Sequence, residues 1–339
     1  MIGAVYVEDA IADHPRTVEI CRRLPRAALI PCEHYGEVFN PRAQSFRLQK
    51  KRPSLILARK SGRFVLPTPA GYGIGARRNF YFSHMLNCLY DCRYCFLQGM
   101  YRSAHYVVFV NYEDFFGEIE KTVDEAGGEI TGFFSGYDCD SLAFESITGF
   151  AEQALRVFRG RPEACLELRT KSTRIDGLLA VEPLASCVVA FSFTPQEVAA
   201  ALEHNVPSVE RRIAALQRLA EHGWPLGLRF DPLIYSRDYR RQYRALFEQV
   251  FAAVDGAALH SVSLGPFRLP APFFRRLERL YGDEPLLAGP FEQYGGLVSY
   301  RRELEAEMVG FCSEQILRHV PRRIFFPCEL PEPREPEES

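Results

Sequence analysis

The sequence predicts an α/β fold in which most strands are parallel. From residue 106 onward, short β-branched and aromatic runs alternate with longer amphipathic stretches, the pattern of repeated strand–helix units. Connections through helices make successive strands parallel. A composition of 47% hydrophobic and 25% charged residues over 339 positions supplies a sizeable core and excludes a disordered chain.

The elements of this fold are predicted in chain order from local patterns. Residues 1–76 form a separate N-terminal α/β lobe with a strand at 4–7 and a helix at 15–24. Residues 77–265 form the main unit, in which helical stretches have apolar residues at three- and four-residue spacing. Its predicted strands are 80–84, 106–111, 130–135, 165–169, 187–193, 226–230 and 261–264, and its predicted helices are 113–125, 146–159, 208–222 and 238–254.

The C-terminal part of the sequence predicts an extension of the main unit. Residues 266–329 begin with a segment rich in proline and aromatic residues, followed by a helix at 300–319 and a short strand at 323–326. Residues 330–339 contain the acidic run PEPREPEES and are expected to be a disordered tail.

The charge of the chain is almost balanced, with 41 basic and 43 acidic residues and a formal net charge of -2. A nucleic-acid surface would therefore have to come from local clustering of cations. One basic stretch in the N-terminal lobe is either a site for phosphates or a solvated face. Its cations are Arg47, Lys50, Lys51, Arg52, Arg59, Lys60 and Arg63.

The N-terminal residues are acidic where a secretory signal would be basic, and no window approaches the roughly 18 apolar residues that cross a bilayer. We therefore expect a cytoplasmic protein with no membrane partner. Ten cysteines in such a protein are not a disulfide framework, so their spacing is read for metal binding or catalysis.

Three cysteines stand together in the segment NCLYDCRYCFLQ. Cys88, Cys92 and Cys95 have C-x3-C-x2-C spacing directly after an apolar strand. Three thiolates can hold three irons of a [4Fe-4S] cluster and leave the fourth iron open, whereas an electron-transfer cluster usually takes a fourth cysteine. S-adenosylmethionine offers an amine and a carboxylate that can chelate an open iron, beside a sulfonium that can be cleaved.

Two other interpretations of these cysteines exist. His84 lies four residues before Cys88, so the pattern H-x3-C-x3-C-x2-C could form a structural zinc site. The protein would then be a zinc-bearing nucleic-acid-binding protein without catalysis. Zinc sites usually pair C-x2-C with a distant second pair, which the sequence lacks. The second interpretation is that the cysteines are merely buried in the core.

The segment CLYDCRYCFLQ resembles the radical S-adenosylmethionine superfamily and, more narrowly, the spore photoproduct lyase family. Further segments match that family in order along nearly the whole chain: ARKSGRF, YVVFVN, DSLAFESIT, RTKS, AFSFTP and LRFDPLI. The resemblance implies a partial (β/α)6 barrel with the site at the carboxyl ends of its strands. It also implies that Tyr94 lies against the adenine of S-adenosylmethionine, and that Lys171 and Ser192 contact this cofactor.

The chain departs from the lyase pattern at three positions. A cysteine that returns a hydrogen atom to the repaired thymine in the family is Tyr137 here, and a relay tyrosine is Phe96. Cys139 occupies the position of a serine that approaches the cofactor. Two-residue spacing in extended backbone would point Cys139 and Tyr137 the same way, so either side chain is a candidate hydrogen-atom donor.

The resemblance implies an enzyme that uses a [4Fe-4S] cluster and S-adenosylmethionine to make a 5'-deoxyadenosyl radical. The implied reaction is carbon–carbon bond cleavage in a thymine dimer of the spore photoproduct type, which is a DNA repair lyase activity. Its partners would be lesion-containing DNA and an electron donor such as a ferredoxin or flavodoxin. Radical chemistry on another nucleic-acid base or a small molecule is the alternative, because of Tyr137 and Phe96.

Overall fold

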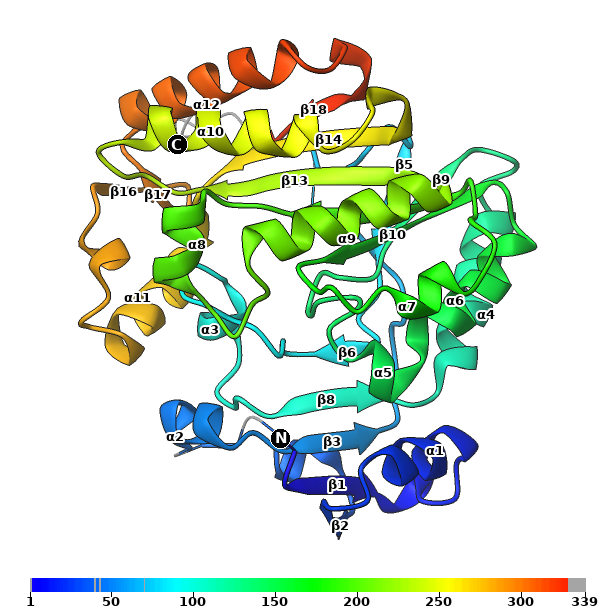
Figure 1. Cartoon of the computed structure of the whole chain (residues 1–339). Helices are drawn as coiled ribbons and strands as arrows, with labels where there is room; N and C mark the ends of the chain where they lie inside the picture. The colour runs from blue at the N-terminus through cyan, green and yellow to red at the C-terminus, as the bar shows by residue number, and fades with distance from the viewer. Residues whose placement is uncertain (1, 40, 43, 70, 329–339) are drawn as a thin grey trace, which may run out of the picture.

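The computed structural model describes residues 2–39, 41–42, 44–69 and 71–328. Its larger sheet has the strand order β18-β14-β13-β11-β10-β9-β5-β4 and curls into a partial barrel (Figure 1). All neighbouring strands in it are parallel except β4 and β5. The strands are β4 (Leu66–Pro67), β5 (Arg78–Tyr81), β9 (Thr131–Phe134), β10 (Ala164–Thr170), β11 (Cys187–Ser192), β13 (Leu226–Leu233), β14 (Leu259–Pro266) and β18 (Phe325–Pro327).

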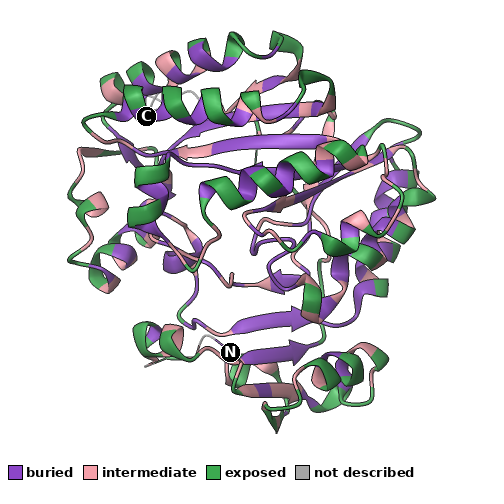
Figure 2. Cartoon of the chain, viewed as in Figure 1, coloured by how far each residue is buried: buried purple, intermediate pink, exposed green. Residues whose placement is uncertain are grey.

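Helices connect these strands and bury one side against the sheet, while their other side is exposed (Figure 2). They are α4 (Tyr112–Asp124), α5 (Glu145–Thr148), α6 (Phe150–Arg159), α7 (Asp176–Leu179), α8 (Gln196–Leu202), α9 (Val209–His222), α10 (Tyr239–Ala252) and α12 (Arg302–Leu317). The prediction of one helix at 146–159 was wrong. Gly149 has a φ of 60°, a left-handed conformation that ends α5 before α6 begins.

A second sheet has the strand order β2-β1-β3-β8-β6. Its strands are β1 (Ala4–Glu8), β2 (Ala28–Cys32), β3 (Leu55–Ala58), β6 (Met85–Leu86) and β8 (Tyr106–Phe109). We expected the strand at 106–111 in the main sheet. That assignment was wrong, because β8 pairs in parallel with β3 of the N-terminal lobe. Every residue of β8 is buried, and a continuous apolar run reads the same in either sheet.

The chain therefore passes between the two sheets immediately before the three cysteines. The strand predicted at 80–84 ends at Tyr81 as β5, and β6 then joins the second sheet through an antiparallel pairing with β8. Strands from both sides of residue 76 share this sheet. The domain boundary at residue 76 stays a prediction. The strand at 4–7 and the helix at 15–24 are confirmed as β1 and α1 (Pro15–Arg23).

The C-terminal extension contains elements that the sequence patterns did not reveal. A three-stranded antiparallel sheet and a helix follow β14, and the predicted helix and strand at its end are α12 and β18. The additional elements are β15 (Arg268–Pro270), α11 (Ala271–Leu280), β16 (Phe291–Tyr294) and β17 (Leu297–Tyr300), and the N-terminal half adds α2 (Phe46–Lys51) and α3 (Leu97–Met100). The tail predicted at 330–339 lies outside the described residues.

Helix α11 packs directly on α3, the short helix that follows the cysteines. A Cβ at Gly99 in α3 would lie 2.5 Å from the main-chain oxygen of Phe273 and 2.8 Å from a methyl group of Leu277. Gly99→Ala is therefore expected to lower the free energy of unfolding by about 1–3 kcal/mol, measured by urea denaturation. Gly117→Ala in α4 is the control, because its Cβ would meet nothing within 4 Å. Equal stability of the two variants would contradict this account of the α3–α11 contact.

Candidate active site

The three cysteines lie on a loop between β6 and α3, which we call the cysteine loop (residues 88–95). Its middle forms β7 (Asp91–Cys92), which pairs antiparallel with β12 (Glu203–His204) so that Cys92 faces Glu203. Its entrance is fixed by Asn87, which has a φ of 67°. The Asn87 side-chain amide donates hydrogen bonds to the main-chain oxygens of Ser103 and His105, at 2.8 and 2.7 Å. The loop is therefore held by elements on both sides of it.

The thiols of the cysteine loop are buried and influence one another. Burial raises the pKa of Cys88 to about 12 and also raises the pKa values of Cys92 and Cys95. The ammonium of Lys171 acts in the opposite direction on Cys92 and Cys95. Thiols in this setting ionise only when a cationic group binds them. Three such thiols beside a lysine fit a [4Fe-4S] cluster with an open iron, since its ligands are cysteine thiolates.

The position of His84 does not favour the zinc interpretation. Its ring stacks on Phe150 with centroids 3.6 Å apart and meets Tyr112 edge-on. His84 therefore belongs to an aromatic cluster with Phe150 and Tyr112.

The burial of His84 predicts a pH dependence of stability. Burial lowers the pKa of His84 to about 3, against roughly 6.5 for a free histidine. The unfolded chain then binds a proton below pH 6.5 that the folded chain does not, so stability falls as the pH decreases from 6.5 toward 3. We expect a loss of about 2 kcal/mol between pH 6.5 and 5 from this group, measured by urea unfolding at each pH. His84→Leu should remove that part of the dependence, and an identical pH profile in this variant would refute the assignment.

A buried polar network joins the cysteine loop to the end of β11. Arg212 on α9 and Glu203 are 2.6 Å apart, with side chains that are 0% and 1% exposed. The hydroxyl of Tyr94 donates to Glu203, and Thr194 donates to the same carboxylate at 2.9 Å. Arg212 also donates to the main-chain oxygen of Ser192 at 2.7 Å. The network thus connects Tyr94 and Ser192, two residues that the sequence predicted for cofactor binding.

Asp140 holds Lys171 in place, as Glu203 holds Tyr94. Its carboxylate accepts a hydrogen bond from the Lys171 main-chain nitrogen at 2.6 Å and one from the Thr170 hydroxyl at 2.7 Å. The Lys171 ammonium lies 5.6 Å from the centre of the Tyr94 ring. Lys171 and Tyr94 therefore lie near each other, and their contact with the cofactor stays a prediction. The sequence analysis missed Asp140, Glu203 and Arg212, which hold these residues in place.

Cys139 and Tyr137 have different surroundings, contrary to the expectation that they point the same way. The segment between β9 and α5 bends and is not extended, so the two-residue spacing does not align them. Cys139 is buried, its thiol donates to the Ser135 main-chain oxygen at 3.7 Å, and the nearby Cys88 contributes to its raised pKa. Tyr137 stacks on Tyr81 with ring centroids 4.2 Å apart and lies 5.8 Å from Phe96.

Beside these residues lies a small pocket of about 20 Å³, whose lining includes the charged side chains of Glu167, Arg169, Arg229 and Asp231. Arg229 lies in its wall and pairs with buried Glu167 at 2.9 Å, which makes it an internal ion pair. Arg169 pairs with Asp231 at 3.3 Å and donates to the Tyr72 hydroxyl at 3.1 Å. Arg169 thus connects Tyr72 and Asp231, and these three residues lie at the carboxyl ends of β10 and β13.

Comparisons with known proteins show which family and which relatives this chain is similar to. A family model described as spore photoproduct lyase matches residues 78–268. The spore photoproduct lyase of Geobacillus sp. (strain Y412MC61) is 27% identical over 238 residues, which cover 66% of this chain and 70% of that protein. The lyase of Bacillus subtilis (strain 168) is 27% identical over 197 residues, or 57% of this chain and 58% of that protein.

Solved structures match over almost the full length. A spore photoproduct lyase variant with a cysteine replaced by serine superposes with a TM-score of 0.84 at 21% identity, covering 97% of this chain and 98% of that one. A double variant with bound AdoMet and dinucleoside spore photoproduct has a TM-score of 0.82 at 20% identity, covering 98% and 99%. The predicted α/β fold with its partial barrel is therefore confirmed.

Proposed function

This chain belongs to the spore photoproduct lyase family, and we propose that it is a radical S-adenosylmethionine enzyme that repairs DNA by cleaving a thymine dimer of the spore photoproduct type. The observation that supports the proposal most is the connection of three predicted cofactor-binding residues with the cysteine loop. One network of buried contacts links the cysteine loop, Tyr94, Lys171 and Ser192 at the carboxyl end of the barrel. Ligand sites of such barrels lie at that end.

In this proposal Cys88, Cys92 and Cys95 ligate a [4Fe-4S] cluster, and Tyr94, Cys139, Lys171 and Ser192 contact S-adenosylmethionine. Bound together, the cluster and S-adenosylmethionine supply one-electron cleavage that yields a 5'-deoxyadenosyl radical. The protein's own part is to position the cofactor and the substrate and to shield them from water. Tyr94 presents a ring whose orientation is fixed by Glu203, and Lys171 brings a cation beside that ring.

Tyr137 is our proposed hydrogen-atom donor to the product, and Cys139 our proposed cofactor contact. Cys139 is buried, and after burial the Cys88 thiol contributes most to its raised pKa, whereas the Tyr137 phenol belongs to the aromatic group around Tyr81 and Phe96. Burial raises the pKa of Tyr137 to about 12, so the phenol keeps its hydrogen at neutral pH. The proposed partners are lesion-containing DNA and an electron donor such as a ferredoxin or flavodoxin, with no membrane partner; the described helices include none long and apolar enough to span a bilayer.

The test is anaerobic reconstitution with iron and sulfide, reduction with dithionite, and incubation with S-adenosylmethionine and dinucleoside spore photoproduct. We expect 5'-deoxyadenosine and repaired thymines from the wild type and neither from Cys92→Ala. A reconstituted wild type that forms no 5'-deoxyadenosine would overturn the radical mechanism. Stoichiometric zinc without iron or sulfide after anaerobic purification would instead favour the zinc-bearing binding protein.

A second candidate function keeps the radical chemistry but changes the substrate to another nucleic-acid base or a small molecule. The observation that favours it is the contact of Tyr137 with Phe96, two residues at positions where the lyase pattern has a donor thiol and a relay phenol. Formation of 5'-deoxyadenosine without any repair of the dinucleoside would support this candidate over the first.

A further inference from the structure

Six cations surround the outer side of the cysteine loop, and the proposed radical chemistry uses none of them. They come from α2, the cysteine loop, the segment after α3, and α11. We call this group the α11 basic surface, and its members are Arg47, Lys50, Arg93, Arg102, Arg276 and Arg279. The whole chain carries a net charge of -2, so this is a local concentration of positive charge.

The α11 basic surface is built around Tyr281, which follows α11. The guanidinium of Arg93 lies 4.1 Å from the centre of the Tyr281 ring, and that of Arg47 lies 5.9 Å from it. The Tyr281 hydroxyl donates to the side-chain oxygen of buried Gln98 in α3 at 3.0 Å. These contacts attach α2 and α11 to the helix that directly follows the cysteine loop.

Arg93 shows which side of the cysteine loop this surface covers. Cys92 and Tyr94 are buried and belong to the region near Lys171, whereas Arg93 between them is partly exposed. Arg93 and the Tyr281 ring that it contacts therefore lie on the side of the loop opposite to the proposed S-adenosylmethionine site. Figure 1 shows α3 and α11 next to each other at the end of the molecule where the arrow of β13 ends.

The positive charges of this surface are close enough to repel one another. Burial lowers the pKa of Arg276, and the neighbouring Arg102 and Arg279 lower it further. Asp91 offsets part of the charge through Arg93 at 3.4 Å and Lys50 at 3.8 Å. Placing like charges together costs free energy that an anionic partner relieves, and such a surface also accelerates association with that partner.

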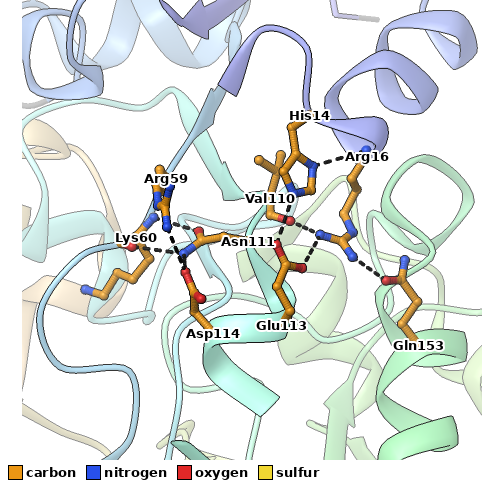
Figure 3. Close-up of polar contacts among 9 residues, drawn as sticks. All are labelled: His14, Arg16, Arg59, Lys60, Val110, Asn111, Glu113, Asp114 and Gln153. Atoms are coloured by element: carbon orange, nitrogen blue, oxygen red, sulfur yellow. Dashed lines mark hydrogen bonds and ion pairs between the residues drawn. The ribbon is translucent and has the colours of Figure 1, made fainter. Parts of the chain in front are cut away.

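The rest of the basic stretch does not extend this surface. Arg59 pairs with Asp114 at 3.5 Å, and the main chain of Lys60 exchanges hydrogen bonds with the Asn111 side chain at 2.8 and 3.0 Å (Figure 3). In the same view Glu113 accepts from His14 and Arg16. The side chains of Arg16 and Arg59 and the main chain of Lys60 thus fasten α1 and the end of β3 to α4. From the basic stretch we therefore assign only Arg47 and Lys50, both in α2, to the α11 basic surface.

We propose that the α11 basic surface is the docking site of an acidic one-electron carrier protein. This inference rests on the proposed function, in which the iron–sulfur centre held by the cysteine loop receives an electron from outside. One electron leaves the reduced carrier and enters that centre; no bond forms or breaks and no proton moves. Docking on the outer side of the loop brings the carrier to the cysteines while the barrel interior stays available to S-adenosylmethionine and the substrate.

The experiment compares two reductants and two substrates. Arg276→Glu/Arg279→Glu is reconstituted and assayed with reduced flavodoxin or with dithionite, on dinucleoside spore photoproduct and on lesion-bearing duplex DNA. The matched control is Arg211→Glu/Arg218→Glu on α9, which makes the same change of charge at two exposed arginines of another helix. The rate of cluster reduction by flavodoxin is followed spectroscopically at increasing salt concentration, which measures the docking without turnover.

We expect the α11 variant to be reduced by flavodoxin roughly tenfold or more slowly than the wild type and the control, with a weaker salt dependence. With dithionite it should process both substrates at the wild-type rate. A variant impaired only on duplex DNA, with either reductant, would overturn the proposal and make this surface a DNA site. Unchanged reduction by flavodoxin, or a wild type that dithionite reduces and flavodoxin does not, would also overturn it. Failure of the proposed function appears separately, as a wild type that is inactive with dithionite.

Discussion

Glu203→Ala is expected to lower the free energy of unfolding by about 3–5 kcal/mol, because it leaves Arg212 buried without a counter-charge. Arg212 is fully buried and pairs with Glu203 at 2.6 Å. Burial by itself would raise the pKa of Glu203, but Arg212 and Lys171 lower it overall, so the carboxylate is ionised in the folded chain. Urea unfolding of the metal-free protein measures the loss.

The same substitution should weaken S-adenosylmethionine binding, because Glu203 fixes Tyr94 and pairs with the strand that carries Cys92. Glu203→Gln is the informative companion, since it keeps the shape of the side chain and a hydrogen-bond partner for Tyr94 while removing the charge. We expect a raised KM for S-adenosylmethionine with a smaller change in kcat in Glu203→Gln, and Thr194→Val should affect both constants only slightly. Wild-type stability in Glu203→Ala would show that the ion pair contributes nothing to the fold.

The strands of the barrel and the cysteine loop were predictable because each is encoded locally. Residues of β11 and β13 form apolar runs of the length of a strand, and the spacing of Cys88, Cys92 and Cys95 is itself the signal. Lys171 and Ser192 were located through the motifs that contain them. The sequence does not indicate which strand pairs with β8, because pairing with β3 or with a barrel strand buries the same side chains.

The residues that support the site are buried charged side chains, which a sequence presents as ordinary surface residues. Arg212 is an exception, because the pattern of residues around it indicates that it is buried. It lies on the apolar face of α9 with Val209, Ile213 and Leu216, at helical spacing, so a buried partner for it could have been sought. Glu203 has no such pattern, because it lies in a two-residue strand after a short helix.

Tyr137→Phe is expected to separate formation of 5'-deoxyadenosine from repair. Phenylalanine keeps the ring that stacks on Tyr81 and contacts Phe96, but it has no hydrogen on oxygen to give. In our proposal one hydrogen atom passes from the Tyr137 oxygen to the thymine carbon radical and leaves a neutral tyrosyl radical. One electron and one proton return it to the phenol, with the electron coming from the carrier protein. We expect the rate of repair to fall at least roughly tenfold, which corresponds to an activation free energy higher by about 1.4 kcal/mol. Formation of 5'-deoxyadenosine should continue.

Isotope labelling and two further variants make this test specific. The phenol hydrogen exchanges with solvent, so repair in D2O should place one deuterium in the thymine product of the wild type. Tyr137→Cys restores a thiol at the position where the family pattern has one and should retain repair with the same label. Cys139→Ser should instead weaken S-adenosylmethionine binding, because the Cys139 thiol lies in the region of Cys88. If Cys139→Ser loses the label while Tyr137→Phe keeps it, the donor is Cys139 and the bend between β9 and α5 brings its thiol to the substrate.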